Sequence, residues 1–294
     1  LSAEQVRGLA VIARRFDRGY GHFTTRQNVQ FNWTRLDDMP RIIRRAAKIA
    51  MTPPMGPVFL SLPGDVLLDE GGIDLGGVTR VDTRVRPSDD AIEALAAKLI
   101  AAKNPALIAG NEIVTSDALA EAGQLAEMLG AAAWQQTIAY GAHFLSKSPA
   151  YIGGLSRGQK EIRDVLEPYD LLLFVGGEGL QTSVASPVVP MPPNATVVQI
   201  GLNDWEMGKN YPTDIAIRAD VGETLRALIP ALERQGGTAL AKTARERLEA
   251  LSKINWSARN TKVRAAAAAK SAASPIEPDW LMLTIVDALP RDAI

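Results

Sequence analysis

The sequence has 294 residues, of which 47% are hydrophobic and 22% are charged, so it can build one large or two medium globular domains. Its 32 basic and 33 acidic side chains nearly cancel, and no apolar run is long enough for a bilayer, so we expect neither a nucleic acid nor a membrane as partner. The absence of cysteine excludes disulfides, thiolate nucleophiles and cysteine-ligated iron–sulfur clusters, and two histidines are too few for a histidine-rich metal site. We expect a cytoplasmic protein without a metal site.

The first part of the chain predicts two helices separated by a hairpin. Residues 3–16 place apolar side chains on one helical face, and residues 22–33 have the pattern of a short hairpin. Asp38 can begin a second helix, with Pro40 in its first turn. The stretch PVFLSLP at 57–63 then predicts a buried strand.

Residues 71–87 are rich in glycine and polar side chains and predict a linker. Strands and helices alternate after it. The predicted strands are 105–110, 131–136, 170–176, 195–201 and 214–220, and the predicted helices are 88–103, 116–129, 158–167 and 221–234. The strands lack period-two alternation, as expected where helices cover both faces. The fold class is therefore α/β, with a Rossmann-like doubly wound parallel sheet over 88–236 and a partial α+β segment at the N-terminus.

The C-terminal part predicts exposed helices. Residues 238–273 are rich in alanine, lysine, arginine and glutamate, which favours a long helix with little core. A new amphipathic helix then begins near Asp279. We expect residues 237–294 to be a helical connector toward a further domain.

Glycines follow three segments of the predicted sheet. They include Gly110 in AGNEI, Gly154 in YIGGLSRG, and Gly176 and Gly177 in LLLFVGGEG. Ligands of open α/β sheets lie at the carboxyl ends of strands, where glycines let a phosphate approach the backbone. These four residues are our candidates for cofactor binding. Tight structural turns are the alternative, because none of the loops is a complete G-x-G-x-x-G motif.

No catalytic residue is predicted from the chain. It has no recognisable serine–histidine–aspartate arrangement and no carboxylate pair with a defensible geometry. His143, in the loop TIAYGAHFLSK, is interpreted as a loop or interface residue.

Residues from about 40 to 294 resemble thiamine-diphosphate-dependent enzymes of the benzoylformate decarboxylase and acetolactate synthase kind. RRAAKIAMTPPMGPVFLSLPGDVL is similar to the end of their pyrimidine-binding domain, here 39–70. NPALIAGNEI and VVQIGLNDWEMGKNYPTDIAIRADV resemble the beginning and the late part of their central domain. For an intact relative, the resemblance implies a 2-keto acid substrate, thiamine diphosphate and Mg²⁺ as cofactors, and a homodimer or homotetramer.

The same resemblance suggests further site residues. Asn203 joins the cofactor-binding candidates, and Gln181, Thr182 and Ser183 correspond to a loop that reaches the substrate pocket. Decarboxylases of this kind carry a substrate-facing histidine at about the position of Ser183, so a substrate that relies on that histidine is in doubt.

Some members of the resembled family hold a flavin dinucleotide in the central domain. They carry acidic residues where this chain has Gly201 and Asn203, and a cation where it has Glu178, so we expect no flavin here. The family's cofactor-activating glutamate and its magnesium–diphosphate segment belong to parts that this chain does not match. We therefore expect the chain alone not to bind thiamine diphosphate.

The stretch RGYGHFTTRQNVQFNW at 18–33 resembles the ferredoxin-like half-domain of sulfite and nitrite reductases, and the likeness covers about 1–38. It implies that Arg26 contacts an anion or a siroheme carboxylate, which a guanidinium suits. Without cysteine, the metal cluster of an intact reductase does not assemble. We expect two unrelated fragments joined between Asp38 and Arg41.

Three functions therefore stay open. The leading hypothesis is the central-domain fragment of a thiamine-diphosphate-dependent 2-keto acid decarboxylase or carboligase that is inactive alone. The alternatives are a sulfite or nitrite reductase fragment, and a non-catalytic nucleotide-binding or structural Rossmann-like module.

Overall fold

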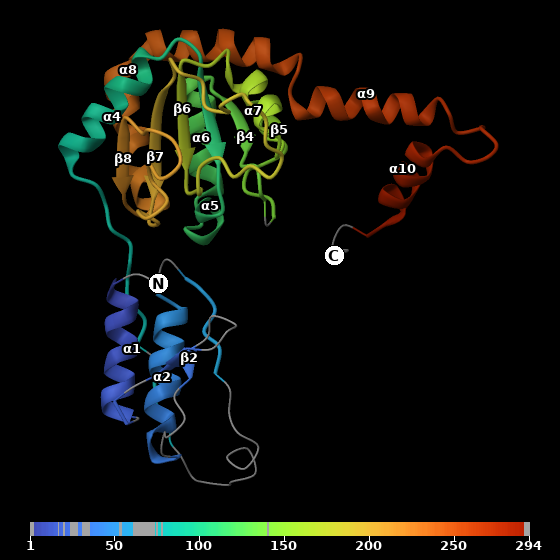
Figure 1. Ribbon diagram of the computed structural model, residues 1–294. Helices are drawn as coiled ribbons and strands as arrows, with labels where there is room; N and C mark the ends of the chain where they lie inside the picture. The colour runs from blue at the N-terminus through green and yellow to red at the C-terminus, as the bar shows by residue number, and fades with distance from the viewer. Residues whose placement is uncertain are drawn as a thin grey trace. The chain divides into compact units, whose positions relative to one another are not determined.

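The computed structural model describes residues 3–16, 18–19, 21–23, 29–30, 36–52, 55–60, 74, 76–77, 79–139 and 141–290. The chain divides into two compact units, 1–83 and 84–294 (Figure 1). The division falls within the segment 71–87 that the sequence predicts as a linker.

The N-terminal unit contains the predicted helices and hairpin. Its elements are α1 (Ala3–Phe16), β1 (His22–Phe23), β2 (Val29–Gln30), the 3₁₀ helix η1 (Leu36–Asp38) and α2 (Met39–Ala50). Strands β1 and β2 pair antiparallel, with His22 opposite Gln30, which confirms the hairpin. Asp38 occupies the N-cap position of α2 without a side-chain capping bond, and Pro40 lies in the first turn.

The predicted buried strand at 57–63 is wrong over residues 57–60, which are irregular and exposed. The side chain of Phe59 is 81% exposed. A buried strand needs neighbouring strands that pair with its backbone and cover its side chains. The strands described in this unit, β1 and β2, have only two residues each. Residues 61–63 lie outside the described part.

The C-terminal unit contains a six-stranded sheet in which every strand pair is parallel. Its strands are β3 (Pro105–Ala109), β4 (Ala132–Gln135), β5 (Tyr151–Gly154), β6 (Leu171–Val175), β7 (Thr196–Gly201) and β8 (Ile215–Arg218). Their spatial order is β5-β4-β3-β6-β7-β8 (Figure 1). This confirms the predicted doubly wound sheet. It corrects the prediction of a loop at 151–158, because residues 151–154 form the edge strand β5.

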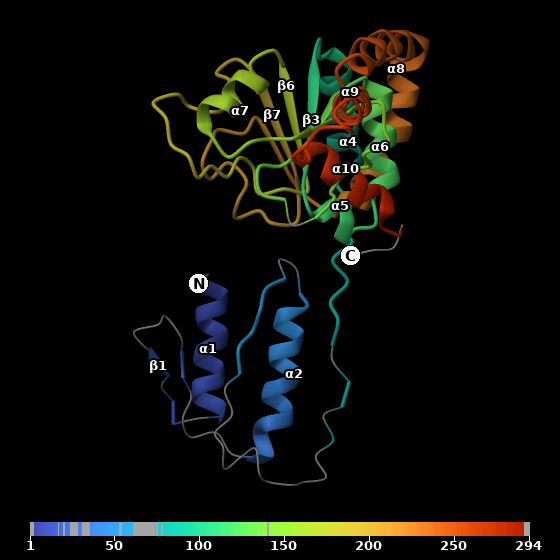
Figure 2. The ribbon, with the colours of Figure 1, turned by 90° about the vertical axis from the view of Figure 1, so that its right-hand side faces the viewer.

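Helices cover both faces of the sheet. The helices of this unit are α4 (Asp89–Ala101), α5 (Glu112–Thr115), α6 (Leu119–Leu129), α7 (Gln159–Leu166), α8 (Val221–Ser252), α9 (Trp256–Ala268) and α10 (Pro278–Ala288), of which α4, α6, α7 and α8 cover the sheet. One apolar cluster packs α4, α6 and α8 against the sheet, and a second packs α7 against the other face (Figure 2). The predicted helix 116–129 begins later than expected, because Asp117 has a left-handed backbone with a φ of 49°.

Central strand β6 explains why the sheet was predictable. All five residues of its LLLFV run are buried. Leu173 belongs to the cluster under α4, α6 and α8, whereas Phe174 belongs to the cluster under α7. Burying each such side chain contributes about 1.5–3 kcal/mol. A strand covered on both faces therefore has no polar positions.

Helix α8 continues past the sheet after a kink at Gly237, where φ is 49°. In the second half of the helix, the Arg247 side chain contacts the core of the C-terminal unit. The Arg247 guanidinium donates from Nη1 to the carbonyl oxygen of Leu129 (2.7 Å) and from Nη2 to that of Ala102 (2.6 Å). These carbonyls lie at the C-terminal ends of α6 and α4. One side chain thus satisfies orphan carbonyls at the ends of two helices.

Candidate functional site

The strand order places the switch point of the sheet between β3 and β6. The chain winds from β3 outward through β4 to β5, then crosses to β6 and continues through β7 to β8. Ligands of such sheets lie at the carboxyl ends of the strands flanking this point. The loops after β3, β6 and β7 meet there.

Three of the predicted cofactor-binding glycines meet at this point, and they pack against each other. The Gly110 amide donates to the carbonyl of Val175 (2.9 Å). A Cβ on Gly110 would lie 2.3 Å from the Gly176 oxygen and 2.3 Å from the Gly177 Cα. Gly176 itself has a φ of 64°, which favours glycine. The glycines allow two backbones to touch, so the space beside Gly110 is filled by protein.

Glu112, in the first turn of α5, spans the switch point. Its carboxylate accepts a hydrogen bond from the amide of Leu202 (2.7 Å) and another from the amide of Asn203. Burial raises the pKa of Glu112 above its ordinary value, and the neighbouring carboxylates of Asp220 and Glu178 raise it further. A side-chain carboxylate therefore occupies backbone donors that could otherwise face a ligand phosphate.

Glu112 was not predicted as a site residue, although it lies in the AGNEI stretch that contains the candidate Gly110. The one available signal was an acidic residue directly after the strand and its glycine. The partners of Glu112 are 90 residues away along the chain, so no local pattern identifies them.

A buried amide adds to the polar groups at this edge. The Gln136 side chain, after β4, donates from Nε2 to the carbonyl of Ile138 (2.8 Å), while its Oε1 has no hydrogen-bond partner. That oxygen lies 2.7 Å from where a Cβ on Gly177 would be. Another glycine position is thus occupied by a neighbouring side chain.

The predicted substrate-pocket loop lies beside the same edge. The amide of Gln181 donates to Thr137 Oγ1 (3.1 Å), and its side chain donates to the Glu178 carboxylate. Thr182 and Ser183 reach toward the loop after β5, where the Ser183 amide donates to the carbonyl of Arg157 (3.1 Å). The loop is therefore held at both ends by hydrogen bonds to residues that follow strands β4 and β5.

Of the two remaining predicted site residues, the structure describes only Gly154, which is not brought to the switch point. Gly154 ends the edge strand β5, two strands away from β3, and nothing lies within 4 Å of where its Cβ would be. Arg26 lies outside the described residues. The roles of all these candidates in binding a cofactor or substrate stay predictions.

His143 is buried rather than exposed in its loop, with 2% of its surface accessible. Its backbone amide donates to Gln135 Oε1 (3.2 Å), while its ring Nδ1 has no hydrogen-bond partner. Burial lowers the pKa of His143, so the neutral ring is favoured. This agrees with its interpretation as a loop residue.

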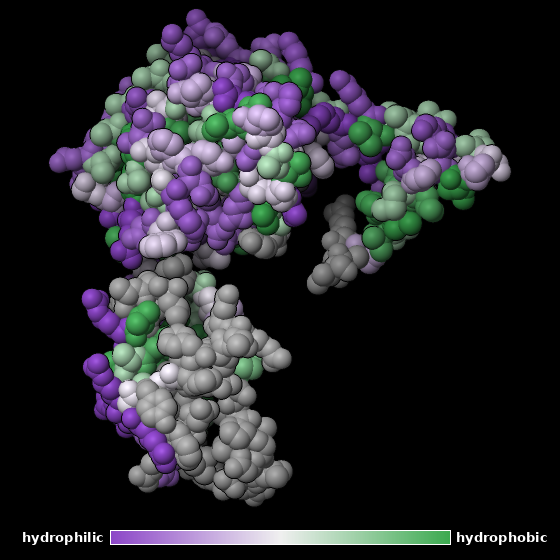
Figure 3. All heavy atoms as spheres, in the orientation of Figure 1, coloured by the Kyte–Doolittle hydropathy of each residue, from purple (hydrophilic) through white to green (hydrophobic). Residues whose placement is uncertain are grey.

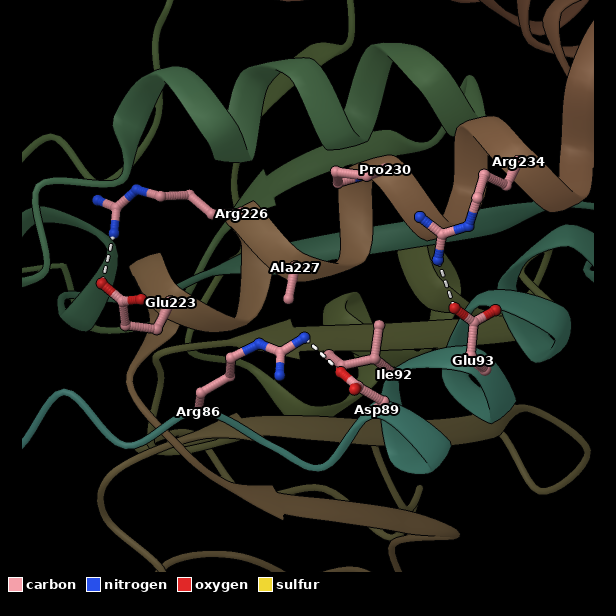
Figure 4. Close-up of a pocket in the computed structure, with 9 residues that line it drawn as sticks. All are labelled: Arg86, Asp89, Ile92, Glu93, Glu223, Arg226, Ala227, Pro230 and Arg234. Carbon is pink, nitrogen blue, oxygen red and sulfur yellow. Dashed lines mark hydrogen bonds and ion pairs between the residues drawn. The ribbon is translucent and has the colours of Figure 1, made fainter.

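A cavity of about 580 Å³ lies between α4 and α8, away from the switch point (Figure 4). Its lining alternates in charge. Arg86 pairs with Asp89 (2.5 Å), Arg226 pairs with Glu223 (2.9 Å), and Arg234 pairs with Glu93. Exposed pairs of this kind contribute little energy and leave no net charge for a ligand. We do not assign a site here.

None of the described helices is both long and apolar enough to span a bilayer. Within the same part of the chain, no group of three or more acidic or histidine side chains is placed to hold a metal ion.

Comparison with protein families matches two parts of the chain. Residues 92–228 match the family described as "Thiamine pyrophosphate enzyme, central domain". Residues 1–49 match "Nitrite/Sulfite reductase ferredoxin-like half domain", so this match includes most of α2. Both resemblances predicted from the sequence are confirmed.

Individual relatives agree with the first match. Benzoylformate decarboxylase of Pseudomonas aeruginosa is 27% identical over 233 residues, which is 73% of this chain and 44% of that protein. Acetolactate synthase isozyme 1 large subunit of Escherichia coli is 28% identical over 204 residues, 68% of this chain and 35% of that protein. The chain thus spans less than half the length of these relatives.

Solved structures give the same result. A thiamine diphosphate-dependent 4-hydroxybenzoylformate decarboxylase of Rhodococcus jostii superposes with a TM-score of 0.59 at 29% identity, covering 66% of this chain and 37% of that one. A putative thiamin diphosphate-dependent enzyme of Mycobacterium smegmatis has a TM-score of 0.59 at 30% identity, covering 67% and 38%.

Proposed function

We propose that the chain, whose residues 92–228 match the thiamine pyrophosphate enzyme central domain, is the central-domain part of a thiamine-diphosphate-dependent 2-keto acid decarboxylase or carboligase. In this proposal the domain is a scaffold that holds no dinucleotide. It spaces the cofactor-binding parts of an intact enzyme and contributes the loop with Gln181, Thr182 and Ser183 to a substrate pocket.

The position of Glu112 supports the scaffold role. Its carboxylate accepts from the amides of Leu202 and Asn203, at the point where dinucleotide phosphates bind in this fold. A bound phosphate would meet this carboxylate and the nearby Glu178 instead of amide donors. The close contact of Gly110 with Gly176 also leaves no space for a pyrophosphate between β3 and β6. These contacts support the proposal that the domain holds no flavin dinucleotide.

The same proposal holds for thiamine diphosphate. Bound in an intact enzyme, it would supply an electron sink after carbon dioxide leaves a 2-keto acid. Its diphosphate is held through a divalent cation, which needs several oxygen ligands. The resemblance places those ligands in a different domain from the central domain that residues 92–228 match. We therefore propose that the chain is inactive alone.

Carbon dioxide release tests the proposal. The purified chain would be incubated with benzoylformate or pyruvate, thiamine diphosphate and Mg²⁺, beside a full-length benzoylformate decarboxylase as positive control. We expect release no faster than in protein-free buffer. Release that depends on thiamine diphosphate would show that the chain carries its own catalytic residues.

A nucleotide-binding module is the second candidate, because the strand order is that of dinucleotide-binding folds. The two proposals differ at Glu112. In a scaffold the Glu112 carboxylate stays hydrogen-bonded to the backbone amides after β7. In a nucleotide site the phosphate of the ligand would have to displace that carboxylate from the amides. Equilibrium dialysis against dinucleotides, with Glu112→Gln as the test variant, separates them.

A further inference from the structure

Strand β8 forms one edge of the parallel sheet, and no described strand pairs with its outer side (Figure 1). Side chains along Ile215–Arg218 alternate between partly buried and exposed. Ile215 and Ile217 pack against the apolar cluster under α4, α6 and α8, whereas Ala216 and Arg218 are exposed on the opposite face. An open edge presents unpaired backbone amides and carbonyls, with which a further strand can pair.

The backbone of β8 presents the polar groups of alternate residues to this open side. The amide of Asp214 donates to the carbonyl of Val197 in β7 (2.9 Å), so residue 214 directs its backbone groups into the sheet. In a parallel ladder both backbone groups of a residue point to the same side, and the side alternates along the strand. Ile215 and Ile217 therefore direct their amides and carbonyls to the open side of β8.

The segment DIAIR, residues 214–218, is complementary to itself when two copies run antiparallel. A two-fold axis at Ala216 places Asp214 opposite the partner's Arg218, and symmetry repeats this pair on the other side of the axis. Both side chains are exposed in the single chain, where Arg218 Nε lies 3.4 Å from the Asp204 carboxylate. Opposite charges directly across an antiparallel strand pair attract each other. A parallel copy in register would instead place like charges side by side, so the charges of β8 favour an antiparallel second copy.

We propose that β8 pairs antiparallel with β8 of a second copy of this chain, so that two six-stranded sheets join into one continuous sheet. Ile215 and the partner's Ile217 exchange two backbone hydrogen bonds, and the symmetric pair exchanges two more. Ala216 meets the partner's Ala216 at the axis, where its small side chain allows the two strands to approach. Because this interface is small, we expect weak association, with a dissociation constant of about 10–100 µM. The proposal does not depend on thiamine diphosphate chemistry.

Sedimentation velocity of the full chain over about 1–300 µM tests the proposal. The test variants are A216K and A216E, each of which places like charges opposite each other at the axis and should weaken association about threefold or more. Because Ala216 is exposed in the single chain, both variants should keep the circular dichroism and thermal midpoint of the wild type. An equimolar mixture of the two restores opposite charges across the axis and should associate about tenfold more tightly than either variant alone. A266K and A266E, at an exposed position of α9, are the matched controls and should associate like the wild type.

A chain that stays monomeric over this range would overturn the proposal. So would a dimer that A216K and A216E leave unchanged, or a mixture that associates no more tightly than its two components. Hydrogen exchange gives a second readout. The amides of Ile215 and Ile217 should exchange more slowly as the protein concentration rises, whereas the amide of Asp214, already bound to Val197, should not change. A dimer that leaves exchange at Ile215 and Ile217 independent of concentration would be formed by another surface.

Discussion

Replacing Arg247 by methionine should destabilise the C-terminal unit substantially. The change removes donors to the buried carbonyls of Leu129 and Ala102 (2.7 and 2.6 Å) and keeps most of the apolar stem. A hydrogen bond from a charged group contributes about 1.5–3 kcal/mol, and a carbonyl left without a partner costs about 1–3 kcal/mol. Because Arg247 is only half-buried, we take the lower values and expect a loss of about 2–4 kcal/mol.

Urea unfolding followed by circular dichroism measures this loss, and the thermal midpoint should fall by about 5–10 °C for a unit of this size. Arg245, exposed on the same helix, gives the matched control R245M, for which we expect a change within about 0.5 kcal/mol. Arg247→Lys keeps the positive charge but loses the planar guanidinium that donates to two carbonyls at once, so its loss of stability should lie between those of R245M and R247M. If R247M and R245M unfold at the same urea concentration, the capping role assigned to Arg247 is wrong.

Two further predictions concern the switch point. Gly110→Ala places a Cβ 2.3 Å from the Gly176 oxygen and should lower the free energy of unfolding by about 3 kcal/mol or more. Gly154→Ala, with no atom within 4 Å of the added Cβ, should be nearly neutral. Equal unfolding midpoints for the two variants would contradict the packing of Gly110 against Gly176. Glu112 has a pKa raised above 4.5, so it stabilises the fold when protonated and that contribution is lost as pH rises through its folded pKa. Stability measured from pH 4 upward should therefore fall relative to Glu112→Gln, and a parallel pH dependence of the two proteins would refute this.

The sequence predicted the sheet well where the signal was local. Strand β6 is a run of five apolar residues buried on both faces, so it needs no knowledge of its neighbours. Strand β5 was missed because two of its four residues are glycines, which favour a loop. The segment 57–63 shows the reverse error: its residues have strand propensity, but residues 57–60 are exposed and pair with no strand in the described part of the chain.

The site was harder to predict than the fold. The glycines at 110, 176 and 177 were correctly placed at the sheet edge, yet the contacts between their backbones depend on the register of two strands far apart in the chain. Glu112 was not singled out, since its partners follow β7. The exposed apolar side chains of α10 (Figure 3) were not predicted, because an amphipathic pattern does not show what its apolar face contacts.

Equilibrium dialysis of the purified chain against flavin adenine dinucleotide and nicotinamide adenine dinucleotide tests the central claim most directly. The claim is that the switch point is occupied by Glu112 and by contacting glycines, so that the central domain acts as a scaffold. We predict no saturable binding of either dinucleotide to the wild type at sub-millimolar concentration. Micromolar binding that changes in Glu112→Gln would contradict the scaffold and establish a nucleotide site at the carboxyl ends of the strands.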